Sequence, residues 1–417
     1  MKIILKSCTI VDEGNSYSAP QDILIENGII SEIAPSINKD ADQTIELENL
    51  HVSTGWFDAR VHFCDPGEEV KEDIHSGLKA AAIGGFTAVG LRSATTPPLS
   101  NKSQIEYVKM KAAQHIVDLY PYATLTEQRK GDNLAEMFDL QQAGAIGFTD
   151  DNATVSGGIM YRALLYTKNF ESRVITFPLD QSIFGEGYVH EGKETVKTGL
   201  KAIPSLAESM TIERDLNLVR YTGGKLHFTG ISTKESVELI RKAKAEGLAV
   251  TADVYLHNLV YNEKEVLGFD SAFKVMPPLR SEDDRLALIQ GIKDGTIDCI
   301  CSDHTPEDIE NKEVEFDHAA FGMIGLQAFF CLINQIQELT LTEKIKAISA
   351  QPRAIFGLPQ AEIKTGNKAN LTLFTTSNST VVSSDWIVSK SKNTPLIGQE
   401  LSGKVYGVFN DDQLALS

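Results

Sequence analysis

The chain has 417 residues, and its 57 aspartate and glutamate residues outnumber its 39 lysine and arginine residues, which gives a formal net charge of −18. This balance argues against a general nucleic-acid binder and against a protein that adheres to anionic membranes, because both need a basic surface. No apolar run approaches the roughly 20 residues that span a bilayer, and the five scattered cysteines are typical of reduced thiols in a cytoplasmic protein.

Both ends of the chain predict short β-strands. Residues 22–35 hold two apolar runs joined by Asn-Gly, the strongest short-range signal for a β-hairpin. Residues 366–376, 385–389 and 401–410 have the same strand-like character near the C-terminus. We therefore expect a small β-sandwich domain formed by both chain termini, residues 1–53 and 367–417.

The middle of the chain has a different rhythm. Residues 71–85 predict a helix that ends in glycines, residues 86–93 predict a buried strand, and the alternation continues to residues 297–304. Such repetition is typical of parallel βαβ units, and about eight of them favour a closed barrel over an open sheet. The predicted fold is α/β, with a (β/α)8 TIM-like barrel over residues 54–366.

Chemistry in such a barrel lies at the C-terminal ends of the strands. After the first barrel strand, Asp58, Arg60, His62 and Cys64 alternate along the chain, so their side chains project to the same side. Two histidines at this spacing could both reach one Zn²⁺, but only one is present. On its own, His62 is therefore more readily explained as a structural residue than as a ligand.

The sequence around these residues resembles the dihydroorotases, which belong to the cyclic amidohydrolase superfamily. DARVHFCDPG is similar to the family signature Asp-x-His-x-His-x-Arg-x-Pro-Gly, and further matches follow in family order. They are KEDIHSGLKAAAIGGFTAV, GFTDD, IPSLAE, HFTGISTKESVELI, KVMPPLR, IDCICSDHTP, FGMIGLQ and QPRAIFGL. The resemblance implies a barrel with a composite β-domain, in agreement with the strand and helix pattern.

The resemblance also shows where this chain departs from the family, whose members bind one or two Zn²⁺ through four histidines and two acidic or modified groups. Three of those histidine positions are occupied by Arg60, Phe177 and Gly230. The residual family ligands are His62, Asp151 and Asp303, of which Asp303 also stands at the family's catalytic position. The positions that contact substrate in the family are replaced too, by Cys64, Ala94, Met276 and Glu307.

These replacements predict an empty metal site. Arg60 adds a positive charge where a dication would lie, and two unit charges about 4 Å apart interact by ~4 kcal/mol at intermediate dielectric. Two carboxylates and one imidazole are too few ligands for a closed zinc site. We expect Arg60 to pair with Asp303 or Asp151 instead, so that a salt bridge replaces the metal.

Other candidate residues have simpler interpretations. Cys299 and Cys301 face the same side of a strand and are expected to be buried thiols. His190 and His318 are expected to face solvent in loops. Asp303 and His304 end a buried strand, where a structural ion pair is at least as plausible as a functional pair.

The resemblance supports three hypotheses for function. The first is a non-catalytic dihydroorotase homologue that binds no cofactor and associates with aspartate transcarbamoylase, as inactive members of this group do in pyrimidine synthesis. The second is an active zinc-dependent dihydroorotase, or a related cyclic amidohydrolase, with an atypical site. The third is a barrel that binds a small ligand without turnover. A cytoplasmic homo-oligomer with no nucleic-acid or membrane partner is expected in each case.

Overall fold

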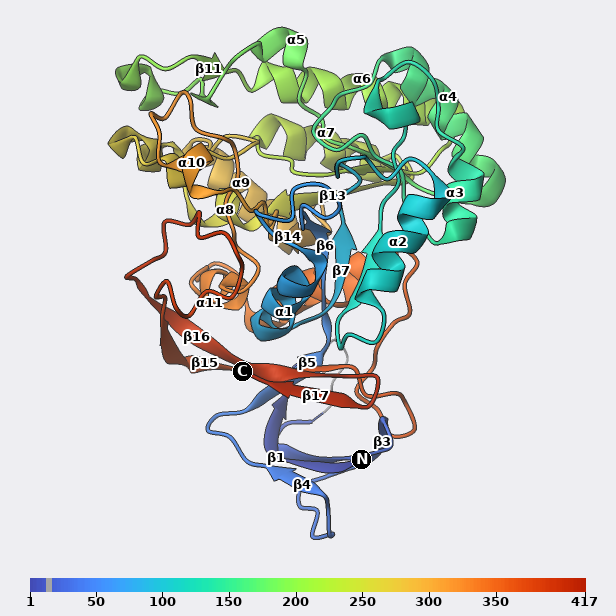
Figure 1. Ribbon diagram of the computed structural model, residues 1–417, viewed down its shortest axis with the longest axis vertical. Helices are drawn as coiled ribbons and strands as arrows, with labels where there is room; N and C mark the ends of the chain where they lie inside the picture. Colours follow the sequence, from blue (N-terminus) through green and yellow to red (C-terminus); the bar gives the residue numbers. More distant parts are fainter. Residues whose placement is uncertain (13–16) are drawn as a thin grey trace.

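The computed structural model describes residues 1–12 and 17–417, which form a barrel above a β-sheet domain that holds both termini (Figure 1). The β-domain has the strand order β17-β16-β15-β5-β1-β2-β3, with β4 also paired to β1. Its strands are β1 (Lys2–Ile10), β2 (Gln21–Glu26), β3 (Ile29–Ala34), β4 (Gln43–Ile45), β5 (His51–Thr54), β15 (Leu371–Val381), β16 (Glu400–Asn410) and β17 (Gln413–Leu416). The strands therefore come from both ends of the chain, as the sequence predicts.

A kink in β1 turns this sheet into two layers. The register of β1 against β2 shifts between Leu5 and Cys8, and Ser7 between them has φ 53°. The first half of β1 pairs with β2 and β4, whereas Thr9 and Ile10 pair with β5. Apolar side chains from the two halves pack into one core, which includes Ile3, Ile23, Val52, Leu371 and Phe409.

Eight parallel segments close the barrel. The named strands are β6 (Trp56–Val61), β7 (Phe86–Leu91), β8 (Asp118–Pro121), β9 (Val174–Thr176), β12 (Leu226–Phe228), β13 (Val250–Tyr255) and β14 (Cys299–Cys301). The fourth segment is very short: Phe148 forms single parallel bridges with Ala123 and Val174 and so joins β8 to β9. A parallel bridge between Val61 and His304 joins β14 back to β6, which completes the ring.

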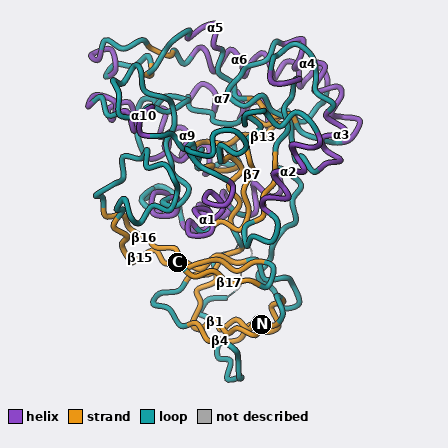
Figure 2. The backbone as a smooth tube through the Cα atoms, in the orientation of Figure 1, coloured by secondary structure: helices purple, strands orange, loops and turns teal. Residues whose placement is uncertain are grey.

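Helices surround these strands (Figure 2). The connections carry α1 (Ile74–Gly84), α2 (Lys102–Ala112), α3 (Met137–Ala143), α4 (Gly157–Thr167), α5 (Gln181–Phe184), α6 (Leu206–Thr222), α7 (Lys234–Ala245), α8 (Leu256–Val260), α9 (Glu282–Lys293), α10 (Ile309–Lys312), α11 (Phe329–Asn334), α12 (Leu341–Ile348) and α13 (Ala350–Ile355). A short pair of strands, β10 (Val189–His190) and β11 (Ala202–Ile203), lies in the excursion between α5 and α6. No helix among the described residues combines the length and apolar character needed to cross a membrane.

Local sequence explains how the first unit is built. The Asp73 side chain accepts a hydrogen bond from the Ser76 backbone N–H, which caps the start of α1. Gly85 ends the helix with φ 95°, and a Cβ there would lie 2.5 Å from the Trp56 ring. Only glycine meets both conditions, so α1 turns directly into β7 and packs against the first barrel strand.

The prediction of a strand at residues 385–389 is wrong, because these residues lie outside the sheet. Between β15 and β16 the chain leaves the sheet and runs up the side of the barrel toward α10, as the red loop in Figure 1 shows. We call residues 382–399 the strap. Gln327 holds it by donating to the Trp386 carbonyl at 2.7 Å and accepting from the Val388 N–H at 2.9 Å. These side-chain bonds satisfy backbone groups that a β-ladder would otherwise pair.

Buried Glu72 fixes the next part of the strap. Its carboxylate accepts hydrogen bonds from the hydroxyls of Ser389 and Ser76 and from the Lys390 backbone N–H. The strap therefore ties the β-domain to the rim of the barrel through the loop that precedes α1.

Candidate functional site

Four charged residues meet at the C-terminal ends of the barrel strands. Arg60 lies near the end of β6, Arg92 follows β7, Asp151 follows the Phe148 segment, and Asp303 follows β14. All four are buried, with at most 7% of any residue exposed. The strand order of the barrel thus brings together side chains that are far apart in the sequence.

Arg60 connects both carboxylates. Its Nε donates to Asp303 Oδ1 at 2.9 Å, and its Nη1 donates to Asp151 Oδ1 at 3.3 Å. Its Nη2 donates to the Asn152 side-chain oxygen at 2.6 Å. The ion pair expected from the sequence is therefore present, and it involves both aspartates rather than one.

Arg92 adds a second guanidinium. Its Nε donates to Asp151 Oδ1 at 3.0 Å, and its Nη1 donates to the Thr305 hydroxyl at 3.2 Å. The Ser93 hydroxyl donates to the other Asp151 oxygen at 3.0 Å. Asp151 thus receives hydrogen bonds on both oxygens, which satisfies a charge that would be costly to bury alone.

The two carboxylates respond differently to this environment. Burial would raise the pKa of Asp151, but Arg92 and Arg60 outweigh it and hold that pKa below its usual range. Burial raises the pKa of Asp303, although Arg60 and Arg92 oppose the change. Asp151 is therefore the firmly ionised partner of the arginine pair.

His62 is buried beside this network as a neutral ring. Burial is the main cause that lowers its pKa to about 3, and the positive charge of Arg92 acts in the same direction. Its Nδ1 is buried without a hydrogen-bond partner among the described residues. The one retained family histidine thus stands next to two arginines that oppose any added positive charge.

Tyr255 fills the space next to Gly230. A Cβ at Gly230 would lie 2.4 Å from Cζ of the Tyr255 ring, which is too close for any larger residue without rearrangement. The same ring lies under Arg60, whose Cζ is 5.2 Å from the ring centre. A histidine at position 230 would need Tyr255 to move, so the pocket has lost room as well as a ligand.

The remaining replaced positions have ordinary packing roles. Phe177 is buried in the apolar cluster inside the barrel, and Met276 packs against the same cluster. Cys64 is buried, and its thiol lies 3.9 Å from the Pro306 carbonyl oxygen. Ala94 is partly buried after β7. Glu307 pairs with Lys71 at 3.0 Å.

The residues present do not fit a zinc ion. Asp151 and Asp303 already hold guanidinium groups, the place beside Gly230 is filled by Tyr255, and Phe177 offers no ligand atom. Zinc needs several donors with free lone pairs within about 2.0–2.3 Å of one point. In this arrangement the positive charge that neutralises the two carboxylates is supplied by arginine side chains.

One different donor group lies deeper in the barrel. Ligand atoms of His227, Asp253 and Cys299 lie within 4.8 Å of one another, and this is the sole such group among the described residues. His227 Nε2 already contacts Asp253 Oδ2 at 2.9 Å, and the Gly230 N–H donates to Asp253 Oδ1 at 2.6 Å. His227 and Asp253 are therefore engaged in hydrogen bonds that join β12 to β13.

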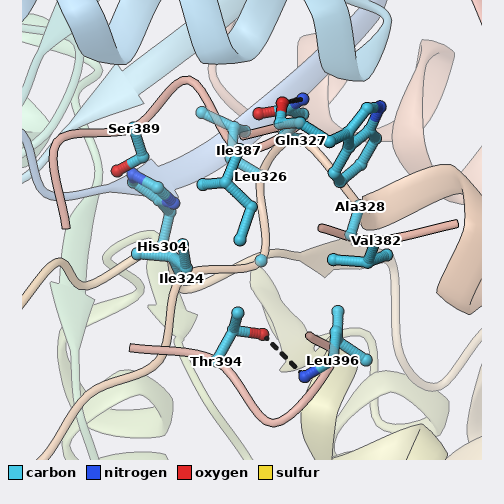
Figure 3. Close-up of a pocket in the computed structure, with 12 residues that line it drawn as sticks. His304, Ile324, Leu326, Gln327, Ala328, Val382, Ile387, Ser389, Thr394 and Leu396 are labelled. Carbon is cyan, nitrogen blue, oxygen red and sulfur yellow. Dashed lines mark hydrogen bonds between the residues drawn. The ribbon is translucent and has the colours of Figure 1, made fainter. Parts of the chain in front are cut away.

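His304 makes contacts outside the arginine network, in a hollow beside the strap (Figure 3). It lines a small hollow with Ile324, Leu326 and Leu396, and its Nε2 lies 3.6 Å from Glu72. Figure 3 also shows Ser389 of the strap beside its ring. Asp303 and His304 thus serve two different contacts, one inside the barrel mouth and one beneath the strap.

Sequence reasoning missed Arg92, Tyr255 and Ser93. Arg92 and Ser93 come directly after a predicted strand, so the rule that strand ends carry chemistry could have found them. Tyr255 gave no such signal, because its role depends on the missing side chain at Gly230. The prediction that His190 faces solvent is wrong: it is 7% exposed, and its Nδ1 lies 3.1 Å from Nη1 of buried Arg280.

The fold and this strand-end site define the chain as a barrel of the cyclic amidohydrolase type. It is similar to solved structures of the L-hydantoinase (dihydropyrimidinase) from Arthrobacter aurescens, with a TM-score of 0.88 and 22% identity over 100% of this chain and 96% of that one. For the dihydropyrimidinase from Brevibacillus agri, the TM-score is 0.85 and the identity 18%, over 100% of this chain and 95% of that one.

Sequence comparison identifies the family. A model described as "Dihydro-orotase-like" matches residues 51–236. Proteins named dihydroorotase from a Thermoanaerobacter strain and from Carboxydothermus hydrogenoformans are 39% and 38% identical, and each match covers 97% of this chain and 95% of the relative. The chain belongs to the dihydroorotase family.

The buried arginine predicts a large effect on stability. Arg60→Ala should lower the free energy of unfolding by about 3–5 kcal/mol, because it leaves Asp303 buried without its closest cation. Arg220→Ala, which breaks an exposed pair with Glu246, should change stability little. Urea unfolding measures both. If the alanine variant does not fold, Arg60→Lys takes its place in the test. This variant keeps the positive charge, so its free energy of unfolding should lie between those of Arg60→Ala and wild type. An unchanged midpoint for Arg60→Ala would contradict the ion-pair account.

His62 predicts a specific pH dependence. Its pKa is about 3 in the folded protein and about 6.5 in an unfolded chain, so the unfolded state binds the extra proton first. The stability due to neutral His62 is complete above pH ~6.5 and is lost as the pH falls toward ~3. Across that window His62→Gln should remove a slope of up to about 1.4 kcal/mol per pH unit.

Urea midpoints between pH 4.5 and 7 test this dependence. Burial lowers the pKa values of His190 and His257 to about 4 and about 3. These two histidines also make stability depend on pH, so His62→Gln should keep part of the slope seen in wild type. His318→Gln is the control, since its side chain is 74% exposed. Parallel curves for His62→Gln and wild type would show that His62 is not buried as a neutral ring.

Proposed function

We propose that this chain is a non-catalytic member of the dihydroorotase family that serves pyrimidine biosynthesis as a partner of aspartate transcarbamoylase. The observation that carries the proposal is the position of Arg60, whose guanidinium bonds to both Asp151 and Asp303. In a zinc-dependent hydrolase the metal makes bound water nucleophilic near neutral pH. Here the two carboxylates that would hold the metal are engaged by arginine.

The substrate side of the site supports the same proposal. Cys64, Ala94 and Met276 stand where the family resemblance places polar contacts to dihydroorotate. Two of these side chains have no charged or strongly polar group, and the Cys64 thiol is buried with its pKa raised by burial. A charged cyclic substrate would therefore lack both an activated water and the groups that orient it.

The preserved part of the molecule supports association as the remaining role. The barrel closes and the helices and the β-domain are all present, although the strand-end ligands are replaced.

We place the protein in the cytoplasm as a homo-oligomer, without nucleic acid or membrane. All five cysteines are free and buried, which agrees with a reducing compartment.

The alternative is an active zinc-dependent dihydroorotase or a related cyclic amidohydrolase. The identity of 38–39% to proteins named dihydroorotase over almost the whole chain favours it. It would require Arg60 and Arg92 to release both carboxylates, and no histidine stands at positions 177 or 230 to complete the metal site.

Turnover and metal content distinguish these functions. Tag-free protein should contain far less than one equivalent of zinc by elemental analysis and should not hydrolyse dihydroorotate, even with added zinc. Arg60→His should not create activity, because Phe177 and Gly230 still provide no ligand. Stoichiometric, chelator-resistant zinc with turnover near ~1 per second would establish the alternative.

Association has its own test. The chain should sediment with purified aspartate transcarbamoylase from the same organism at low salt, and the complex should weaken as salt rises, because the net charge of −18 favours a basic partner surface. Sedimentation of each protein alone is the control. Absence of a complex at low salt would remove this partner from the proposal.

A further inference from the structure

We propose that buried Lys274 locks a two-part lid over the mouth of the barrel. The first part is the excursion of residues 181–205, which holds α5, β10 and β11, and the second is the loop of residues 313–322 after α10. We call these parts the lid excursion and the lid loop. The inference concerns access to the arginine network, so it does not depend on association with a partner.

The lid excursion lies on the side of the barrel where the strands end. Phe184 of α5 packs against the apolar cluster that contains Phe177, which follows β9, and Tyr255, which ends β13. At the far end of the excursion, the Ile203 carbonyl accepts a hydrogen bond from Nη1 of buried Arg280 at 2.9 Å. The excursion therefore reaches across the C-terminal ends of neighbouring strands, which is where the sites of such barrels open.

The lid loop belongs to the connection that follows β14. Lys312 Nζ donates to the carbonyls of Ala320 and Gly322 at 2.9 and 3.0 Å, which closes the loop on its own base. Phe316 of the lid loop and Val189 of the lid excursion belong to one buried apolar cluster. The two parts of the lid therefore pack together, although they follow different strands.

Lys274 lies where the two parts meet. Its Nζ lies 4.3 Å from the centre of the Tyr188 ring, 4.9 Å from that of Phe321 and 5.7 Å from that of Phe316. The same Nζ donates to the Asp317 carbonyl at 2.8 Å, and Lys274 is only 2% exposed. A cation is attracted by the face of each ring. One ammonium group thus holds the lid excursion and the lid loop together.

The charge on Lys274 is part of the lock. Burial lowers the pKa of its amine to about 8, and the Asp317 carboxylate acts in the opposite direction, so the ammonium form predominates at pH 7. A methionine would fill much of the same space, but it would neither donate to the Asp317 carbonyl nor attract the rings as a cation. The Gly322 N–H donates to the Lys274 backbone carbonyl at 2.9 Å, and side-chain variants keep that bond.

Hydrogen–deuterium exchange, followed by mass spectrometry, tests the lock in Lys274→Met and Lys274→Ala. Backbone amides of both lid parts should exchange at least about tenfold faster in the variants, because each opening breaks fewer contacts. Amides of the β-domain should exchange as in wild type. Lys404→Met is the matched control, since the Lys404 Nζ lies 5.6 Å from the Tyr406 ring centre on an exposed side chain of β16.

Alkylation of Cys64 tests whether the lid covers the barrel mouth. Cys64 follows β6, is 1% exposed, and lies beside the Pro306 carbonyl in the connection that leads to the lid loop. Iodoacetamide should label it at least about tenfold faster in the Lys274 variants, because labelling of a buried thiol requires local opening. Cys8, buried in the β-domain, is the internal control and should react as in wild type.

The outcomes are separable from those that test the proposed function. Faster exchange confined to the lid, together with faster alkylation of Cys64, supports the lock whether or not aspartate transcarbamoylase binds. If Lys274→Ala does not fold, Lys274→Met decides alone. Wild-type exchange in the lid of Lys274→Met, the same change in Lys404→Met, or an unchanged rate of Cys64 alkylation would each overturn the lock.

Discussion

A guanidinium group buried in the mouth of the barrel must be neutralised, and this requirement organises the site. Arg60 has almost no access to water, so its charge has to be met by carboxylates held at hydrogen-bond distance. Asp151 and Asp303 meet it from two different strand ends. Each carboxylate in turn needs the arginine, since either acid alone would be costly to bury.

The residues around Arg60 support its pairing with Asp151 and Asp303. Arg92 and Ser93 complete the bonding of Asp151, and Tyr255 packs under Arg60 while it fills the space beside Gly230. A single reverse substitution therefore cannot restore the family's metal site. The network can hold the barrel mouth in one arrangement with no cofactor, which is what the proposed non-catalytic role requires.

Much of the architecture could be predicted from the sequence because its signals are local. The alternation of strand and helix patterns, the Asn27-Gly28 turn and the glycines after α1 each depend on residues close in the chain. The segment at 385–389 could not be predicted in this way. Its apolar residues suggest a strand, but the distant side chains of Gln327 and Glu72 hold it outside the sheet.

The features of the site also differ in whether the sequence could predict them. The pairing of Arg60 with an aspartate could be predicted, because the resemblance places those residues at neighbouring strand ends and charge requires a partner. The participation of Arg92 and the filling of space by Tyr255 could not, since both depend on packing between strands that are far apart in sequence. The burial of His190 against Arg280 has the same origin.

The central claim is that arginine occupies the place of the metal. A crystal structure determined after soaking in excess zinc, with data collected at the zinc absorption edge, tests it directly. The account predicts no anomalous peak between His62, Asp151 and Asp303, with the Arg60 guanidinium in density within hydrogen-bond distance of both carboxylates. A strong peak at that point, with Arg60 turned away, would contradict it.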